Sequence, residues 1–267
     1  MKTLLVFFGA LIGFSAVGQD VIQFGRRIEA PSGSGYSVAS ASFDGVNDQI
    51  SFSGSAVTMS GSGTAFTIAG MIDLDTDGSA MFIVQGRSGG SGPAWNLRRT
   101  SGNVLELVVQ NSSSVTVLDV FTTTAVAEAA DGKIHFYITA DLTSTSTRAF
   151  YINGSAAAVD WYTYNTSGVM ALDRTDLYIG ADDGLGNDFG GDVAQLWFDD
   201  AYWAGATYIS AFYNSGPVDL GATGSIPTGA SPDGFFRFVG GSLGVNSGAD
   251  GGTGTLTGDV TSGATFP

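Results

Sequence analysis

Short runs of alternating or continuous apolar residues follow one another from Phe43 onward, and Gly, Asn, Asp and Ser interrupt them. The runs recur roughly every 8–15 residues, which is typical of antiparallel sandwiches and barrels rather than of alternating strands and helices. The pattern predicts strands at 42–43, 49–52, 65–73, 80–86, 95–99, 104–110, 115–121, 133–141, 148–152, 156–161, 176–180 and 192–199.

The run at 133–141 alternates most regularly. Ile134, Phe136, Ile138 and Ala140 alternate with more polar residues that include His135. Because successive side chains of a strand point to opposite faces, this predicts one apolar face that packs inward.

Local signals predict a few further elements. Asn153-Gly154 is the strongest hairpin turn, because both residues accept positive φ. Residues 204–213 carry Ile209, Phe212 and Tyr213 at helical spacing and predict one short helix. In the last fifty residues, rich in Gly, Thr and Ser, only 235–239 is strand-like.

The first eighteen residues have a pattern of their own. Met1 and Lys2 precede an apolar run from Leu4 to Phe14, and small residues follow up to Gly18. This is the pattern of a secretory signal peptide, although an apolar arm buried inside an assembly explains it as well. The run is too short to span a bilayer comfortably, so we expect no membrane span in the mature chain.

A series of ordered motifs resembles a known fold family. The motifs are ASFDGVNDQISF (41–52), FTIAGMIDLD (66–75), DGKIHFYITAD (131–141), AFYINGS (149–155), DLYIGADDG (176–184), FGGDVAQLWFDDAYW (189–203) and ISAFYNSG (209–216). In this order they resemble the laminin-G-like branch of the concanavalin A-like lectin/glucanase family. Ile134 stands where such domains usually carry Trp. The resemblance implies an all-β fold, a two-sheet antiparallel jelly-roll sandwich with a curved concave face.

The resemblance also divides the chain. We expect a signal-like N-terminus or buried arm at 1–18, a lead-in segment at 19–40, the sandwich at 41–216 and a Gly/Thr-rich C-terminal extension at 217–267. The stretch GGSLGVNSGADGGTGTLTGDVTSGAT (240–265) resembles the tails of virion proteins of tailed bacteriophages. Its composition suggests a tail that becomes ordered only against a partner.

Charge and composition exclude several classes of function. Ten Lys and Arg oppose 25 Asp and Glu, for a net charge of −15. Duplex nucleic-acid binding needs a basic surface, and so does a polybasic membrane anchor, so neither is expected. The chain has 0 Cys, so disulfides and thiolate metal sites are excluded.

Catalytic patterns are missing too. Glucanases of the similar fold use two carboxylates at alternate positions of one strand, and none of Glu29, Glu106 and Glu128 has such a partner two or four residues away. His135 is the single His, lies mid-strand and is interpreted as structural rather than as part of a Ser-His-Asp triad. We therefore expect no enzymatic activity.

Two residue groups are candidates for binding. Trp161, Tyr162 and Tyr164 crowd one segment and would suit sugar stacking, unless they pack between the sheets. By alternation, Trp161 should point one way and the two tyrosines the other.

The second group is a possible Ca²⁺ site. Four oxygen-bearing residues lie in a loop with interspersed Gly, and Ca²⁺ prefers such ligands; a solvated acidic turn is the alternative. These residues are Asp182, Asp183, Asn187 and Asp188. Laminin-G-like domains often carry one Ca²⁺ at a loop rim, so the resemblance allows Ca²⁺ as the one cofactor.

Together these observations favour a non-enzymatic module displayed on a surface. We expect a tailed-phage virion protein, either a capsid decoration or a fibre/adhesin subunit, that binds glycans at the virion surface. A secreted bacterial lectin-like adhesin is the alternative, and a glycan-cleaving enzyme is a weaker one. Expected partners are other virion or cell-surface proteins and glycans, within an oligomer or larger assembly.

Overall fold

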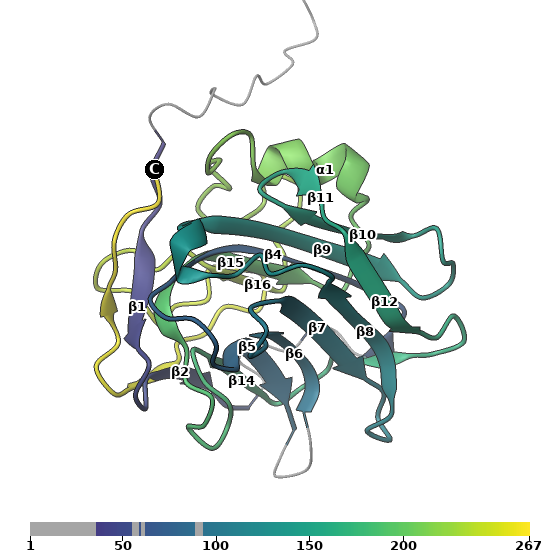
Figure 1. Cartoon of the computed structure of the whole chain (residues 1–267), viewed down its shortest axis with the longest axis horizontal. Helices are drawn as coiled ribbons and strands as arrows, with labels where there is room; N and C mark the ends of the chain where they lie inside the picture. The colour runs from purple at the N-terminus through teal and green to yellow at the C-terminus, as the bar shows by residue number, and fades with distance from the viewer. Residues whose placement is uncertain (1–35, 55–58, 60–61, 89–92) are drawn as a thin grey trace, which may run out of the picture.

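The computed structural model describes residues 36–54, 59, 62–88 and 93–267, and nearly all of its elements are strands (Figure 1). The signal-like segment 1–18 and most of the lead-in lie outside the described residues. The strands form two large sheets with antiparallel pairing throughout. The predicted two-sheet jelly-roll sandwich is confirmed.

Sheet I has the order β11-β10-β9-β4-β15-β1-β18, and β16 pairs with β15 beside this path. Its strands are β1 (Ser40–Asp44), β4 (Ala65–Leu74), β9 (Ile134–Asp141), β10 (Arg148–Ile152), β11 (Ser155–Ala156), β15 (Gly190–Asp199), β16 (Gly234–Phe236) and β18 (Thr261–Ser262).

Sheet II has the order β12-β8-β7-β6-β5-β14-β2-β17. Its strands are β2 (Gln49–Phe52), β5 (Met81–Arg87), β6 (Pro93–Arg99), β7 (Leu105–Gln110), β8 (Thr116–Thr122), β12 (Val159–Tyr164), β14 (Asp176–Ile179) and β17 (Thr255–Thr257). A small pair, β3 (Ser62–Gly63) with β13 (Met170–Ala171), lies apart, and a 3₁₀ turn covers Ala129–Asp131.

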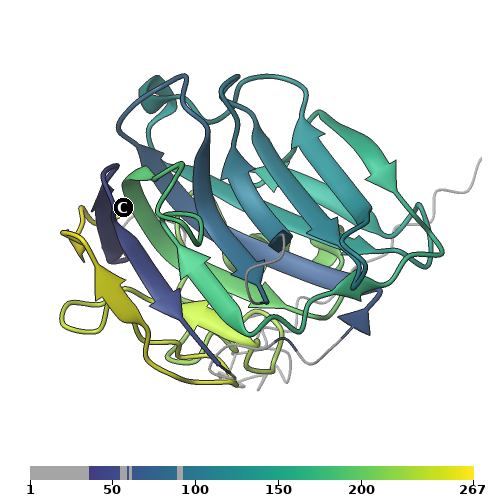
Figure 2. The same cartoon turned by 90° about the horizontal axis from the view of Figure 1, so that it is seen from below.

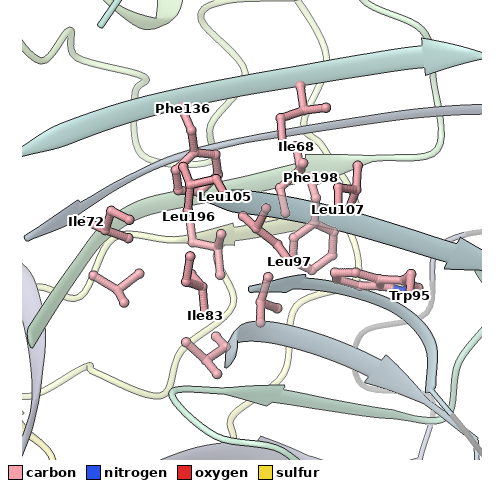
Figure 3. Packing of buried hydrophobic residues seen from close by; sticks show 14 of the residues in the cluster. Ile68, Ile72, Ile83, Trp95, Leu97, Leu105, Leu107, Phe136, Leu196 and Phe198 are labelled. Atoms are coloured by element: carbon pink, nitrogen blue, oxygen red, sulfur yellow. The ribbon is translucent and has the colours of Figure 1, made fainter. Parts of the chain in front are cut away.

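The main core lies between the two sheets. Phe136 and Phe198 of sheet I meet Trp95 and Leu107 of sheet II, and all four are fully or almost fully buried (Figure 3). The indole of Trp95 lies directly over Gly86, where an added Cβ would sit 2.1 Å from the indole Nε1. Glycine at position 86 therefore makes room for the largest core side chain of sheet II.

The outer face of sheet I is covered as well. Helix α1 (Gly205–Phe212), close to its predicted range, packs against it and lies over β9 to β11 in Figure 1. The Phe212 ring lies 5.1 Å from that of Tyr137 and 5.0 Å from that of Trp197. Both faces of β9 are consequently buried, and His135 on its outer face is 2% exposed. No described helix is long and apolar enough to cross a membrane.

The C-terminal segment belongs to the sandwich in this structure. It supplies β16 to sheet I, β17 to the edge of sheet II and β18 to the edge of sheet I. Phe235 and Phe236 are buried, and Phe266 exchanges two 2.9 Å backbone hydrogen bonds with Val38. We expected order only against a partner. Widely spaced buried phenylalanines and open sheet edges instead fix the segment on its own chain.

The predicted hairpin is confirmed: Asn153 and Gly154 have φ of 49° and 75°, and Ile152 pairs with Ser155. The strand expected at 156–161 is instead divided. Ala156 ends β11 in sheet I, and β12 begins at Val159 in sheet II. The chain crosses between the sheets here, which a continuous polar/apolar pattern does not reveal.

Candidate functional site

The outer face of sheet II is the broad surface that α1 leaves uncovered. Seen from below in Figure 2, the strands of this sheet lie in front. Leu107 pairs with Leu97 and Val120 in the core. The alternate residues therefore point outward. We call this surface the open face; it comprises Phe82, Gln85, Asn96, Arg98, Glu106, Val108, Gln110, Asp119, Phe121 and Tyr178.

Three side-chain acceptors of the open face have no hydrogen-bond partner. They are Oδ1 of Asn96, Oε1 of Gln110 and Oδ1 of Asp119, all buried among the described residues. Asn96 and Asp119 both pair with Val108, so they lie two strand spacings, about 10 Å, apart. A buried acceptor without a donor costs free energy. A ligand that displaced the side chains covering these atoms and supplied donors to them would gain stabilising hydrogen bonds.

Aromatic rings flank a charged pair in the neighbouring row. Phe82 pairs with Arg98, Arg98 with Glu106, and Glu106 with Phe121. Nε of Arg98 donates to Oε2 of Glu106 at 2.6 Å. Both phenylalanines are half-buried, so each keeps exposed ring surface. Exposed rings beside fixed polar groups suit ligands with an apolar face and a hydroxylated rim.

Asp119 is a carboxyl group of this surface with a shifted pKa. Burial raises the pKa of its carboxyl above the usual range, the charge of Glu106 raises it further, and Arg98 acts in the opposite direction. Glu106 and Asp119 lie diagonally on neighbouring strands. The spacing of carboxylates along single strands does not reveal this pair, whereas the consecutive strands predicted at 104–110 and 115–121 are the signal in the sequence that points to it.

The predicted aromatic cluster does not form one platform. A β-bulge between Asp160 and Thr163 breaks the alternation of β12. Trp161 and Tyr164 therefore lie together, half-buried, with ring centroids 5.7 Å apart. Tyr162 is 74% exposed. The expectation that both tyrosines oppose Trp161 is wrong, because it assumed an unbroken strand.

The predicted metal loop connects β14 to β15. The carboxylate of Asp182 accepts hydrogen bonds from the N–H groups of Gly184 and Gly186 and from Asn187 Nδ2, so it shapes its own turn. Asp183 pairs with Arg87.

Asp188 has a buried acceptor without a partner in this loop. It accepts from the backbone N–H of Asn47 at 3.0 Å through one oxygen, while its buried Oδ1 has no partner. One orphaned oxygen is short of the six to eight that Ca²⁺ takes, unless carbonyls and waters add the rest. The calcium site stays a prediction.

Two further titratable features lie on the covered side. Within the described part of the chain, only Asp199, Asp200 and Asp233 bring three carboxylates within 4.8 Å of one another. Burial, then the charges of Asp200 and Asp199, raise the pKa of Asp233 to about 7. Burial lowers the pKa of His135 to about 3, and its ring stacks on Tyr213 at 4.9 Å. A neutral, packed His135 agrees with a structural role.

The fold can be compared with known proteins. No protein-family model matches the chain, and no curated protein is significantly similar to it. A Bacteroides ovatus ATCC 8483 protein, to which carbohydrate binding is ascribed, superposes with a TM-score of 0.55 at 15% identity, over 85% of this chain and 59% of that one.

Two other solved structures match more loosely. A heptameric SAP-like pentraxin from Limulus polyphemus gives a TM-score of 0.48 at 14% identity, over 67% of this chain and 84% of that one. Mouse laminin α1 domains LG4-5 give 0.41 at 11% identity, over 60% and 40%. The two antiparallel sheets and the match to the Bacteroides ovatus structure agree with the jelly-roll sandwich that the motifs predict.

Proposed function

We propose that this chain is a non-enzymatic glycan-binding module and that the open face is its binding surface. The main support for this proposal is the set of buried, unpartnered acceptors on Asn96, Gln110 and Asp119. Sugar hydroxyls donate hydrogen bonds to such atoms, and sugar C–H faces pack on aromatic rings such as those of Phe82 and Phe121.

The fold comparison supports this proposal but does not identify the ligand. The Bacteroides ovatus protein with the same fold is described by its carbohydrate binding. A sheet face whose strands lie about 4.8 Å apart also presents a repeating set of contacts to an extended chain of sugars.

Glycan-array binding of the full chain tests the proposal. The wild type should retain at least one class of glycan. Asp119→Ala should weaken that binding roughly tenfold or more, because it removes a charged acceptor. Asp173→Ala, which changes an exposed carboxylate outside the open face, should bind like the wild type. Absence of any retained glycan, or equal binding by both variants, would overturn the proposal.

A second candidate function, glycan cleavage, rests on the pair of Glu106 and Asp119. Two carboxyl groups on one sheet face, one with a raised pKa, are the basic requirement for glycoside hydrolysis. We favour binding alone, because Glu106 is already held by Arg98. The retained glycan should release no new reducing ends. Release that is abolished by Glu106→Gln and by Asp119→Asn would replace binding with hydrolysis.

We further propose that the module is displayed on a tailed-phage virion, as a decoration or fibre subunit within an assembly. The tail-like composition of 240–265 and the small number of Lys residues support this proposal. The alternative is an exported bacterial adhesin. The intact mass of the native protein separates the two: a chain that begins at Gln19 indicates signal cleavage and export, and one that begins at Met1 or Lys2 favours the virion.

A further inference from the structure

A pocket at the side of the sandwich contains an arginine with unusual surroundings. Arg148 begins β10 of sheet I, and its half-buried side chain reaches β12 of sheet II, which lies beside β10 in Figure 1. Its guanidinium carbon lies 4.9 Å from the ring centroid of Trp161 and 4.7 Å from that of Tyr164. Two aromatic rings therefore hold the cation in place.

The hydrogen-bonding groups of Arg148 have no partner among the described residues. Every other described Lys or Arg side chain has one: Arg87, Arg98, Arg99, Lys133, Arg174 and Arg237 each make an ion pair or a hydrogen bond. In a chain of net charge −15, this contrast is unexpected. A guanidinium carries five N–H donors in a planar fork that matches a carboxylate.

The pocket beside this guanidinium has room for a small ligand. Its volume is about 280 Å³. Arg148 is the one charged residue among the described residues of its lining, and Phe150, Val159 and Trp161 supply apolar walls. Drug-sized ligands occupy pockets of about 300 Å³ or more, so a single sugar ring or small acid is the better match.

We propose that this pocket binds a carboxylate-bearing ligand of the size of one sugar ring, such as a uronic acid unit. The carboxylate accepts two parallel hydrogen bonds from Arg148, and the apolar face of the ring packs on Trp161. The surrounding negative charge repels anions at long range, so recognition depends on these short contacts. The site is separate from the open face and does not rest on the proposed function.

Titration of the full chain with sodium glucuronate, followed by NMR at low salt, tests this proposal. Glucose has the same ring without the carboxylate and should bind at least roughly tenfold more weakly. Arg148→Gln should abolish glucuronate binding. Arg174→Gln, which removes a cation bonded to the Ala171 carbonyl elsewhere, is the matched control and should bind like the wild type.

Three results would overturn the assignment: equal binding of glucose and glucuronate, full binding by Arg148→Gln, or stronger binding of inorganic phosphate than of glucuronate. Should Arg148→Gln fail to fold, the wild type decides alone, because added NaCl must weaken glucuronate binding. Asp119→Ala should leave this binding intact, which separates a failure here from a failure of the open face.

Discussion

The two outer faces of the sandwich come from strands with similar alternation and have opposite fates. On sheet I, Tyr137 and Trp197 lie under α1 and the C-terminal segment and are fully buried. On sheet II, Phe82 and Phe121 remain half-exposed beside charged residues. Aromatic side chains point outward on both sheets, so the covering segments decide which face serves stability and which face is left for ligands.

Polar groups show the same contrast. Trp197 Nε1 donates to the Gly224 carbonyl at 3.0 Å, and Gln195 Nε2 donates to the Val218 carbonyl at 2.9 Å. The covering segment thus supplies partners for Trp197 and Gln195, although the buried Nδ1 of His135 on the same face has none. Asn96 and Asp119 on the open face keep acceptors without donors. Unpartnered buried atoms therefore occur on both faces, and those of the open face suggest a ligand because α1 and the C-terminal segment do not cover them.

Two phenylalanine substitutions, one on each outer face, test this comparison. Phe235→Ala on the covered face removes a ring that is 1% exposed and should cost about 3–5 kcal/mol of unfolding free energy. Phe82→Ala on the open face should cost about 1 kcal/mol or less, since its ring is only half-buried. Urea unfolding measures both. Equal losses would mean that the open face is also a structural core.

Binding of Ca²⁺ would stabilise the loop that joins the two sheets. If the predicted site at 182–188 exists, Ca²⁺ at about 100 times its Kd stabilises the fold by about 2.7 kcal/mol. The melting temperature should rise with CaCl₂ and fall with a chelator, and Asp188→Asn should remove the response. A melting temperature that is indifferent to both reagents would remove the metal from the account.

Substitutions of aromatic residues at the edge between the two faces should change the unfolding free energy less. Trp161 is half-buried against the core, so Trp161→Ala should cost about 2 kcal/mol, less than a fully buried Trp. Tyr162→Ala should change stability by about 0.5 kcal/mol or less, because the side chain is 74% exposed. Thermal unfolding compares the two. A neutral Trp161→Ala would show that packing of the indole against the core does not stabilise the fold.

A further prediction is a pH dependence of stability on the covered side. The pKa of Asp233 is raised from 3.8 to about 7 on folding. Between these values the folded chain keeps a proton that the unfolded chain has lost, so this group lowers stability as pH rises from about 4 to 7. The stability of wild type relative to Asp233→Asn should fall across this window. A constant difference would show that Asp233 titrates normally.

Sequence patterns were sufficient for the fold because alternation and turn residues act locally. The 133–141 strand, the Asn153-Gly154 turn and the short helix all follow from neighbours along the chain. The bulge that separates Tyr162 from Trp161 depends on the pairing with β8, which local pattern does not specify.

The candidate binding surfaces depend on residues that are distant in sequence. Asn96 and Asp119 come together only through Val108 on the strand between them. Arg148 meets Trp161 because β10 and β12 lie in different sheets at the same side of the sandwich. Neither arrangement has a spacing signature in the sequence, so both required the structure.

Amide hydrogen exchange of the full chain, with and without the glycan that binds best on an array, tests the central claim most directly. We predict slower exchange in β6, β7 and β8, the strands that carry Asn96, Gln110 and Asp119. Exchange in β9 and β15 under the covering segments should not change. Protection confined to the covered face, or no protection anywhere, would contradict the account.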